Sequence, residues 1–370
     1  MNHFFSLAES MGHESVVFCN DPVSGLKAII GIHDTTLGPA LGGTRLWSYD
    51  NEADALKDVM RLSRGMTYKA ACAGLHLGGG KAVIIARPEQ KTEAMFRAFG
   101  RFVNSLGGRY ITAEDVNTGV VDMDFVRAET PYVTGVSKAY GGSGDPSPVT
   151  SLGVFCGLEA AVKLRLGRTD LKGVRVAVQG IGNVGKYLCQ YLSEAGAKLV
   201  VSDINASRAQ EMVKLYGATQ VENDAIFTAD VDVFAPCALG AILNSTTIPL
   251  LKATVIAGGA NNQLEDEVKH GNMVKDRKIA YCPDYVINAG GLINVYNELL
   301  GYDREKALSE AKNIGKTIQS ILADATKQDI TSNEASRIFA ENRIKNAKNL
   351  KAMSTLQDSA LGKLRSTRMS

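Results

Sequence analysis

The stretch that decides the fold is Val174-Arg-Val-Ala-Val-Gln-Gly180-Ile-Gly182-Asn-Val-Gly185. It begins as a short apolar run typical of a buried strand, and then matches the G-x-G-x-x-G pattern before a helix that we expect to end near Gly196. The glycines allow a tight turn and bring backbone N–H groups and the helix N-terminus against a pyrophosphate. This order of strand, loop and helix predicts a Rossmann βαβ unit that binds NAD at Gly180, Gly182, Asn183, Val184 and Gly185.

The next apolar run ends at Asp203, which lies 23 positions after Gly180. An acidic side chain at this place accepts hydrogen bonds from the adenine ribose. It would also repel the extra phosphate of NADP, so the sequence favours NAD. The alternative is an ordinary βα turn followed by a surface aspartate, and the complete order of elements argues against it.

Outward from this unit, the sequence predicts a parallel, doubly wound sheet. The short apolar runs that indicate it lie at 198–202, 231–234, 255–257 and 279–281. Upstream, strand-like segments at 27–32, 43–49, 82–86 and 109–112 alternate with helices expected from about Asn51 and over 93–106. The glycines and two prolines of 141–148 exclude regular structure and mark a hinge. We therefore predict an α/β protein of two domains with a cleft between them. Residues 1–140 form a substrate-binding and catalytic domain, residues 141–334 form the NAD-binding Rossmann domain, and helices of about 335–370 return to the first domain.

The composition points to a small-molecule partner. The 370 residues include 41 Lys and Arg against 39 Asp and Glu, without a long run of one sign, so neither nucleic acid nor a membrane surface is expected as partner. Six cysteines without a C-x-x-C pair fit reduced thiols better than a disulfide framework or a zinc site, and no metal is expected. The N-terminus lacks the pattern of a signal peptide or membrane span, so we expect a cytoplasmic protein.

Three charged residues of the first domain are candidates for the chemistry. Lys69 ends the long helix, and Lys81 follows three glycines that allow close approach of a ligand. Burial and a second cation would lower the pKa of a lysine until it can act as a base. From spacing alone, solvated surface lysines are the simpler interpretation. Asp115 follows a strand and is either a second proton-transfer group or a helix cap.

These residues belong to motifs that run over nearly the whole chain: Gly38–Arg45, Arg64–Lys69, Gly78–Lys81, Thr112–Val116, Pro146–Thr150, Ala235–Gly240, Ala260–Gln263 and Pro283–Gly291. In this order they resemble the glutamate/leucine/phenylalanine/valine dehydrogenase superfamily, and within it they are most similar to leucine dehydrogenases. The resemblance implies a mixed sheet and an oligomerisation role for the first domain. It also reverses the interpretation of the lysines.

By that resemblance, Lys81 would be the general base, Asp115 would assist proton transfer, and Lys69 and Asn262 would bind the substrate carboxylate. The nicotinamide and ribose side of the cleft would be lined by Thr150, Cys237, Ala238, Asn261 and Asn288. The implied reaction is reversible NAD-dependent oxidative deamination of an L-amino acid to a 2-oxo acid and ammonia. The protein would be a homo-oligomer, an octamer in preference to a dimer.

The positions that match the family's side-chain pocket are Leu41, Gly43, Ala113, Leu292 and Val295. None is a Lys, Arg or Ser that could receive a second carboxylate, so leucine, valine and isoleucine are favoured. Ordinary helix packing is the alternative role for Leu292 and Val295. Leu292 departs from the valine typical of leucine dehydrogenases, and Gly291–Asn297 is also similar to tryptophan dehydrogenase.

A tryptophan or phenylalanine dehydrogenase of the same superfamily therefore stays open as an alternative. A non-catalytic NAD-binding regulator is an alternative of another class, against which the retained Lys69, Lys81 and Asp115 argue. A hydroxy-acid dehydrogenase is a third possibility, although the five histidines show no pattern that suits it.

Overall fold

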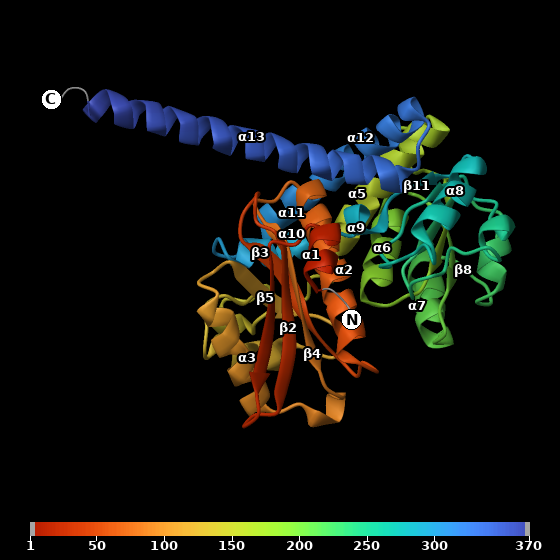
Figure 1. The fold of residues 1–370 in the computed structure, drawn as a ribbon. Coiled ribbons are helices and arrows are strands. Elements are labelled where there is room, and N and C mark those ends of the chain that lie inside the picture. Colours follow the sequence, from red (N-terminus) through yellow and green to blue (C-terminus); the bar gives the residue numbers. More distant parts are fainter. Residues whose placement is uncertain (1–3, 367–370) are drawn as a thin grey trace.

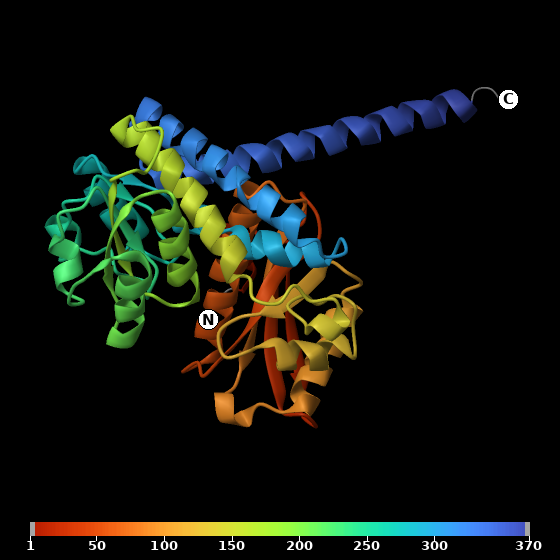
Figure 2. The ribbon, with the colours of Figure 1, turned by 180° about the vertical axis from the view of Figure 1, so that it is seen from behind.

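The computed structural model describes residues 4–366, with side chains for residues 5–350. Two α/β bodies lie side by side, each built around its own sheet (Figures 1 and 2). The last helix, α13 (Ser332–Ser366), begins beside α8 and α12, packs across α2 and extends beyond the rest of the structure at its far end (Figure 1).

The N-terminal body holds a five-stranded mixed sheet in the order β1-β2-β4-β3-β5. The β1–β2 and β2–β4 pairs are antiparallel, whereas β3 runs parallel to β4 and β5. Its elements are α1 (Phe4–Met11), β1 (Ser15–Asp21), β2 (Leu26–Asp34), β3 (Ala40–Trp47), α2 (Glu52–Cys72), β4 (Gly78–Ile85), η1 (Pro88–Gln90), α3 (Glu93–Ser105), β5 (Tyr110–Glu114), α4 (Val120–Arg127) and η2 (Lys138–Tyr140).

Helices cover both faces of this sheet. The side chain of Asn51 caps α2 by accepting a hydrogen bond from the backbone N–H of Asp54, and the apolar side of that helix packs on Ile29 and Val83. On the opposite face, Phe96 and Phe99 of α3 pack against β2 and β4. The helix α2 therefore runs along the sheet and brings its last turn to one end of β4.

The second body holds a six-stranded sheet whose pairs are all parallel, in the order β11-β10-β9-β6-β7-β8. This is the Rossmann order, with its switch point between β6 and β9. The remaining elements of the chain are α5 (Ser147–Leu166), β6 (Arg175–Gln179), α6 (Asn183–Glu194), β7 (Lys198–Ser202), α7 (Ala206–Tyr216), β8 (Thr219–Gln220), η3 (Ala225–Thr228), β9 (Val233–Pro236), η4 (Ile248–Leu250), β10 (Val255–Ile256), α8 (Glu267–Asp276), β11 (Ala280–Tyr281), α9 (Asp284–Ile287), α10 (Gly290–Glu298), α11 (Arg304–Ala311) and α12 (Asn313–Gln328).

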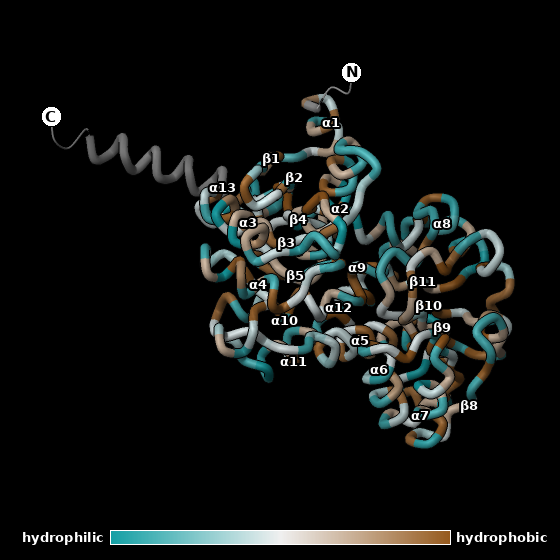
Figure 3. Tube along the Cα trace, turned by 90° about the horizontal axis from the view of Figure 1, so that it is seen from below, coloured by the Kyte–Doolittle hydropathy of each residue, from teal (hydrophilic) through white to brown (hydrophobic). Residues whose placement is uncertain are grey.

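The largest apolar cluster joins the two bodies. It includes Val176 and Val178 of β6 with the inner sides of α5, α6 and α12, and it continues through Ala70 to Leu77 of the N-terminal body. Teal, hydrophilic residues occur along many of the outer loops and helix ends in Figure 3. The last turn of α2 is therefore packed at the junction of the two bodies.

The structure corrects several predicted boundaries. The strand expected at 82–86 begins at Gly78, so the three glycines lie within β4. They have to be small: a Cβ on Gly79 would lie 2.1 Å from the backbone nitrogen of Thr67. The segment expected to be irregular up to Pro148 already turns into α5 at Ser147, because proline fits the first turn of a helix. The strand β1, which precedes the first predicted strand, forms the edge of the sheet.

Candidate functional site

The glycine loop after β6 has the geometry that its sequence predicts. Gly180 has a φ of +91°, and a Cβ at this position would lie 2.7 Å from the Cβ of Ala238. Gly185 packs on the same turn, since a Cβ there would lie 2.0 Å from the carbonyl oxygen of Gly180. The carboxylate of Asp203 accepts hydrogen bonds from the backbone N–H groups of Ile181 (2.6 Å) and Asn205 (2.7 Å). The loop is thereby held against the end of β7.

The same region fits a bound dinucleotide. A Cβ at Gly182 would meet no heavy atom within 4 Å, so the backbone at the start of α6 lies open. No side chain caps that helix, which leaves its first N–H groups to bind phosphate oxygens. Two buried side-chain oxygens at the ends of β6 and β7, Gln179 Oε1 and Ser202 Oγ, have no hydrogen-bond partner in the described part of the chain. This opening lies at the switch point of the sheet.

Lys69 connects the two bodies. It lies in the last turn of α2, and its ammonium donates a 2.7 Å hydrogen bond to Oδ1 of Asn288, which follows α9. Asn288 in turn donates to Oδ1 of Asn261 at 2.7 Å. Asn262 adopts a φ of +50°, a conformation that asparagine tolerates better than most residues. The structure thus brings residues predicted for substrate and cofactor into one chain of contacts.

Lys81 and Asp115 form a buried ion pair. Lys81 lies in the middle of β4 and Asp115 directly after β5, and Lys81 Nζ is 2.9 Å from Asp115 Oδ1. Only 7% of the Lys81 side chain is exposed, so few water molecules reach its ammonium. Of the two roles proposed for Asp115, the structure shows a residue paired with the candidate base rather than a helix cap.

The electrostatic environment shifts the proton affinity of all three groups. Burial lowers the pKa of Lys69 from 10.5 to about 8, against the attraction of Asp284 and with help from the charge of Lys81. Burial also lowers the pKa of Lys81, although Asp115 opposes the shift. Burial would raise the pKa of Asp115, but the positive charges of Lys81 and Arg45 hold it below the ordinary value. The site therefore combines two lysines of weakened basicity with an ionised carboxylate.

The predicted pocket residues come from three elements. Leu41 and Gly43 lie on β3 and Ala113 on β5, where Gly43 is the register partner of Ala113. Leu292, on α10, is 6% exposed and Leu41 is 2% exposed; both belong to the apolar cluster that joins the bodies, and Val295 packs against it. A Cβ on Gly43 would lie 2.9 Å from the Cβ of Asp115, so glycine is needed beside the candidate acid.

Two further predicted cofactor residues, Thr150 and Cys237, lie against glycines of other segments. Thr150, in the first turn of α5, would be 3.1 Å from a Cβ added at Gly291. The backbone N–H of Gly259 donates to Cys237 Sγ at 3.4 Å, and a Cβ at Gly259 would press on Val184. Burial raises the pKa of the Cys237 thiol to about 11, so it stays protonated. All six cysteines are free.

Four charged residues outside the predicted set also lie around the predicted site residues. Arg45 and Asp58 lie behind Asp115, Asp284 lies near Lys69, and Glu298 binds the segment before α5. Arg45 and Asp284 are members of the motifs quoted above, but nothing in their spacing reveals a partner. These contacts join segments that are far apart in the sequence.

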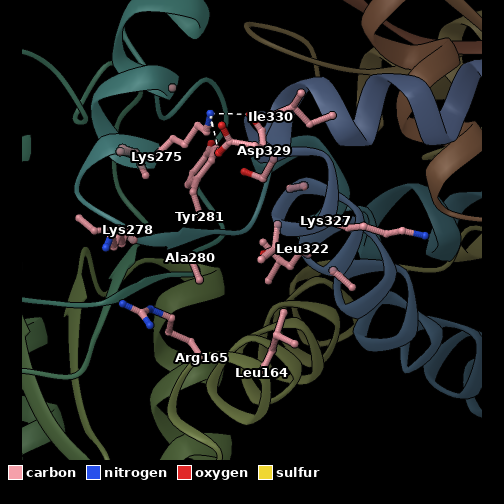
Figure 4. A pocket seen from close by; sticks show the side chains of 17 residues that line it. Leu164, Arg165, Lys275, Lys278, Ala280, Tyr281, Leu322, Lys327, Asp329 and Ile330 are labelled. Atoms are coloured by element: carbon pink, nitrogen blue, oxygen red, sulfur yellow. Dashed lines mark hydrogen bonds and ion pairs between the residues drawn. The ribbon is translucent and has the colours of Figure 1, made fainter.

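A separate hollow of about 600 Å³ lies between α5, α8 and α12 (Figure 4). Leu164, Leu322 and Tyr281 line it, and Lys275 pairs with Asp329 at its edge. None of the predicted site residues contributes to it. Within residues 4–366, no cluster of potential metal ligands occurs, and no helix is long and apolar enough to cross a membrane.

Known proteins match almost the whole chain. The family described as Glu/Leu/Phe/Val dehydrogenase, dimerisation domain, matches residues 13–132, and Glutamate/Leucine/Phenylalanine/Valine dehydrogenase matches residues 141–211 and 202–354. An L-tryptophan dehydrogenase of Nostoc punctiforme is 56% identical over 348 residues, which cover 94% of this chain and 98% of the relative. A leucine dehydrogenase of Bacillus cereus is 54% identical over 346 residues, which cover 93% and 94%.

The crystal structure of the Nostoc punctiforme L-tryptophan dehydrogenase superposes with a TM-score of 0.86 at 55% identity and covers 93% of this chain and 99% of that one. These matches confirm the two-domain α/β fold, the resemblance drawn from the motifs and NAD as the cofactor. The chain belongs to the Glu/Leu/Phe/Val dehydrogenase family and is an NAD-dependent amino acid dehydrogenase.

Proposed function

We propose that the protein catalyses the reversible oxidative deamination of branched-chain aliphatic L-amino acids, with leucine, valine and isoleucine as substrates. The proposal is supported by three observations: Lys69 bonds Asn288 of the second body, Lys81 pairs with Asp115, and Leu41 and Leu292 both belong to the apolar cluster that joins the two bodies. The charged residues would bind the α-amino acid end of the substrate, and the aliphatic residues would receive its side chain.

The ammonium of Lys69 has three N–H donors and uses one on Asn288, so two can bind a substrate carboxylate, together with Asn262. Lys81 removes a proton from the water that attacks the iminium carbon of the oxidised substrate, for which its lowered pKa suits it. Asp115 assists proton transfer to the amine that leaves as ammonia. NAD, when bound, accepts the hydride from the α-carbon.

NAD would be held by Gly180, Gly182, Asn183, Val184 and Gly185 at the pyrophosphate and by Asp203 at the adenine ribose, as the open turn before α6 allows. Thr150, Cys237, Ala238, Asn261 and Asn288 would line the nicotinamide and ribose side. We place the catalytic domain at 1–140, including the return of α13, and the NAD-binding domain at 141–334. Closing the cleft would exclude water from the hydride step.

The second candidate substrate is tryptophan, because Leu292 and the segment Gly291–Asn297 are similar to tryptophan dehydrogenase and such a relative is as similar as the leucine enzymes. Phenylalanine is a third. An apolar pocket discriminates one methylene by only about 1 to 3 kcal/mol, so several aliphatic substrates are expected to react.

The test is NADH absorbance on mixing the protein with NAD and L-leucine, L-valine, L-isoleucine, L-phenylalanine or L-tryptophan at alkaline pH. We expect the highest kcat/KM with a branched aliphatic substrate. A higher kcat/KM with tryptophan would replace the proposed substrate, and no turnover with any of the five would contradict the proposed activity.

The assignment of Lys81 is tested by Lys81→Ala. General acid–base groups contribute about 10²- to 10⁴-fold, so we expect kcat to fall by at least that order while NADH still binds. The matched control is Lys57→Ala, because Lys57 is exposed on α2 away from these contacts. Equal loss of NADH binding in Lys81→Ala would refute its role as the base.

We also propose a homo-oligomer, an octamer rather than a dimer. The matched dimerisation domain and the exposed Phe18 on the edge strand β1 support an assembly, while the octamer rests on the resemblance to leucine dehydrogenases. The free thiols support the proposal of a cytoplasmic location.

A further inference from the structure

A row of alternating charges runs from the buried Lys81 to the protein surface. Asp115 accepts from Lys81 through Oδ1 (2.9 Å) and from Arg45 Nε through Oδ2 (3.0 Å). Arg45 Nη1 reaches Oδ2 of Asp58 at 3.0 Å, and Arg61 Nη2 reaches the other oxygen of Asp58 at 3.0 Å. The side chains of Asp115, Arg45 and Asp58 are 23%, 21% and 17% exposed, whereas that of Arg61 is 52% exposed.

Each inner member of the row is held from two sides. Asp58 lies on α2 and also accepts a 2.8 Å hydrogen bond from the hydroxyl of Tyr49. Arg45 lies on β3 and uses two different nitrogens for its two carboxylates. The planar guanidinium fixes both directions at once, which a lysine cannot do. The carboxylate of Asp115 has therefore little freedom to turn away from Lys81.

We propose that Arg45 and Asp58 are positioning residues of the reaction: Arg45 holds the Asp115 carboxylate against Lys81, and Asp58 holds Arg45. The inference rests on the proposed function, in which Lys81 is the base and Asp115 carries protons. Neither Arg45 nor Asp58 touches the reacting atoms. They act through Asp115, whose orientation decides where the proton goes.

The charges also act on Lys81 at a distance. Among the groups around Lys81, burial lowers its pKa most, Asp115 and Asp58 raise it, and Arg45 lowers it. The nearby Lys69 is a second cation of the site, with Asp284 beside it. Removing Arg45 or removing Asp58 should therefore move the pKa of Lys81 in opposite directions, a result that loosened packing does not predict.

The experiment compares Arg45→Gln, Arg45→Lys and Asp58→Asn with the wild type in kcat/KM against pH, with NAD and L-leucine. For Arg45→Gln we expect kcat to fall roughly 10- to 100-fold, as for a misplaced catalytic group. KM for leucine should change less than kcat. The acid limb of the kcat/KM profile should move to higher pH in Arg45→Gln and to lower pH in Asp58→Asn. In Arg45→Lys the acid limb should lie where it does in the wild type, and part of the wild-type kcat should be retained.

A readout that needs no turnover separates this inference from the proposed function. The rate of reductive methylation of Lys81 by formaldehyde and sodium cyanoborohydride, followed against pH by peptide mass spectrometry, should show the same opposite displacements. Arg97→Gln is the control, because Arg97 pairs with Glu93 and Glu129 on the far side of the sheet. Thermal unfolding and NADH binding verify folding. If the pH profiles of Lys81 methylation shift in the same direction in both variants, or do not shift in either, the proposal is overturned even if the wild type oxidises leucine. If the profiles shift in opposite directions but the wild type is inactive, only the dehydrogenase function is rejected.

Discussion

The ammonium of Lys69 lies at the end of a helix whose sequence gives no sign that this position is buried. Its partner Asn288 is 219 positions away, and the charge of Asp284 reaches it from the same distant segment. Spacing could place Lys69 at a helix end but favoured solvation, and only the motif order indicated chemistry. The glycine loop at Gly180 was predictable because its partners, such as Asp203, are local. The environment of side chains that depend on contacts between the two bodies was not predictable.

Lys69→Met should make the protein more stable near neutral pH and inactive. The folded pKa of Lys69 is about 8 and its ordinary value is 10.5, so below pH 8 both folded and unfolded chains hold the proton and folding bears the full cost of burying a charge. The difference of about 2.5 between these two pKa values is worth at most ~3.4 kcal/mol, at 1.36 kcal/mol per pH unit. Because Asp284 loses its counter-charge in the variant, we expect a gain of about 1 to 2 kcal/mol.

Urea unfolding at several pH values measures this effect. Between about pH 8 and 10.5 the unfolded wild-type chain binds more protons than the folded one, so wild-type stability rises with pH and the advantage of Lys69→Met shrinks. Lys57→Met, on the exposed side of the same helix, should show no such trend. An advantage for Lys69→Met that stays constant through this range would show that the buried charge is not its cause.

Among the elements, the segment before α5 was predicted as a hinge from its glycines, and Gly141 and Gly144 indeed adopt positive φ. Its attachment was not predictable. The carboxylate of Glu298, at the end of α10, accepts from the backbone N–H groups of Gly135 (2.8 Å) and Ser143 (2.9 Å) and from the Ser143 hydroxyl. The segment is thus tied to the helix that carries Leu292 and Val295. A glycine pattern indicates where a chain can bend, whereas the contact that restrains the bend depends on a residue 155 positions later.

Glu298→Gln should loosen this segment. Glutamine has one acceptor oxygen in place of two, so its NH₂ group would face a donor at Gly135 or Ser143. Hydrogen bonds to charged groups contribute about 1.5 to 3 kcal/mol, and we expect the free energy of unfolding to fall by about 2 kcal/mol. Hydrogen exchange should rise over 135–146 more than elsewhere. Glu305→Gln, on an exposed turn of α11, serves as the control, and equal exchange over 135–146 in both variants would contradict the restraint.

On the scale of the whole molecule, both sheets were predicted because strand and helix periods are local, although the mixed character of the first sheet came only from the resemblance. The edge strand β1 was missed, and so was the extent to which one apolar cluster joins the bodies. The sequence predicted that the C-terminal helix packs against the first domain, but it did not predict the residue that attaches it. That anchor is Arg343 of α13, which donates to the carbonyl oxygens of Ala70 (3.2 Å), Ala71 (2.8 Å) and Leu75 (2.8 Å).

Arg343 therefore adds donors at and just beyond the C-terminal end of α2, where a positive charge is favoured. The carbonyl oxygens of Ala70 and Ala71 also accept from the backbone N–H groups of Leu75 and Gly74. The same last turn holds Lys69. Arg343→Met keeps the length of the side chain and removes these donors, so we expect unfolding free energy to fall by about 2 to 3 kcal/mol. Because the end of α2 would then move, KM for the amino acid should rise roughly 3- to 10-fold. The Kd for NADH should change little, since the glycine loop lies in the other body.

Steady-state kinetics, NADH titration and urea unfolding on Arg343→Met and Arg337→Met measure these three quantities together. Arg337 lies on the same helix, and within residues 5–350 its ion pair is with the exposed Glu341, so its substitution should leave both KM and stability near the wild type. If α13 were only a surface attachment, Arg343→Met would lose stability with no change in KM. If it supports the whole assembly, KM and the Kd for NADH would rise together. Only a rise in KM at constant Kd agrees with a helix that acts on the substrate site through the end of α2.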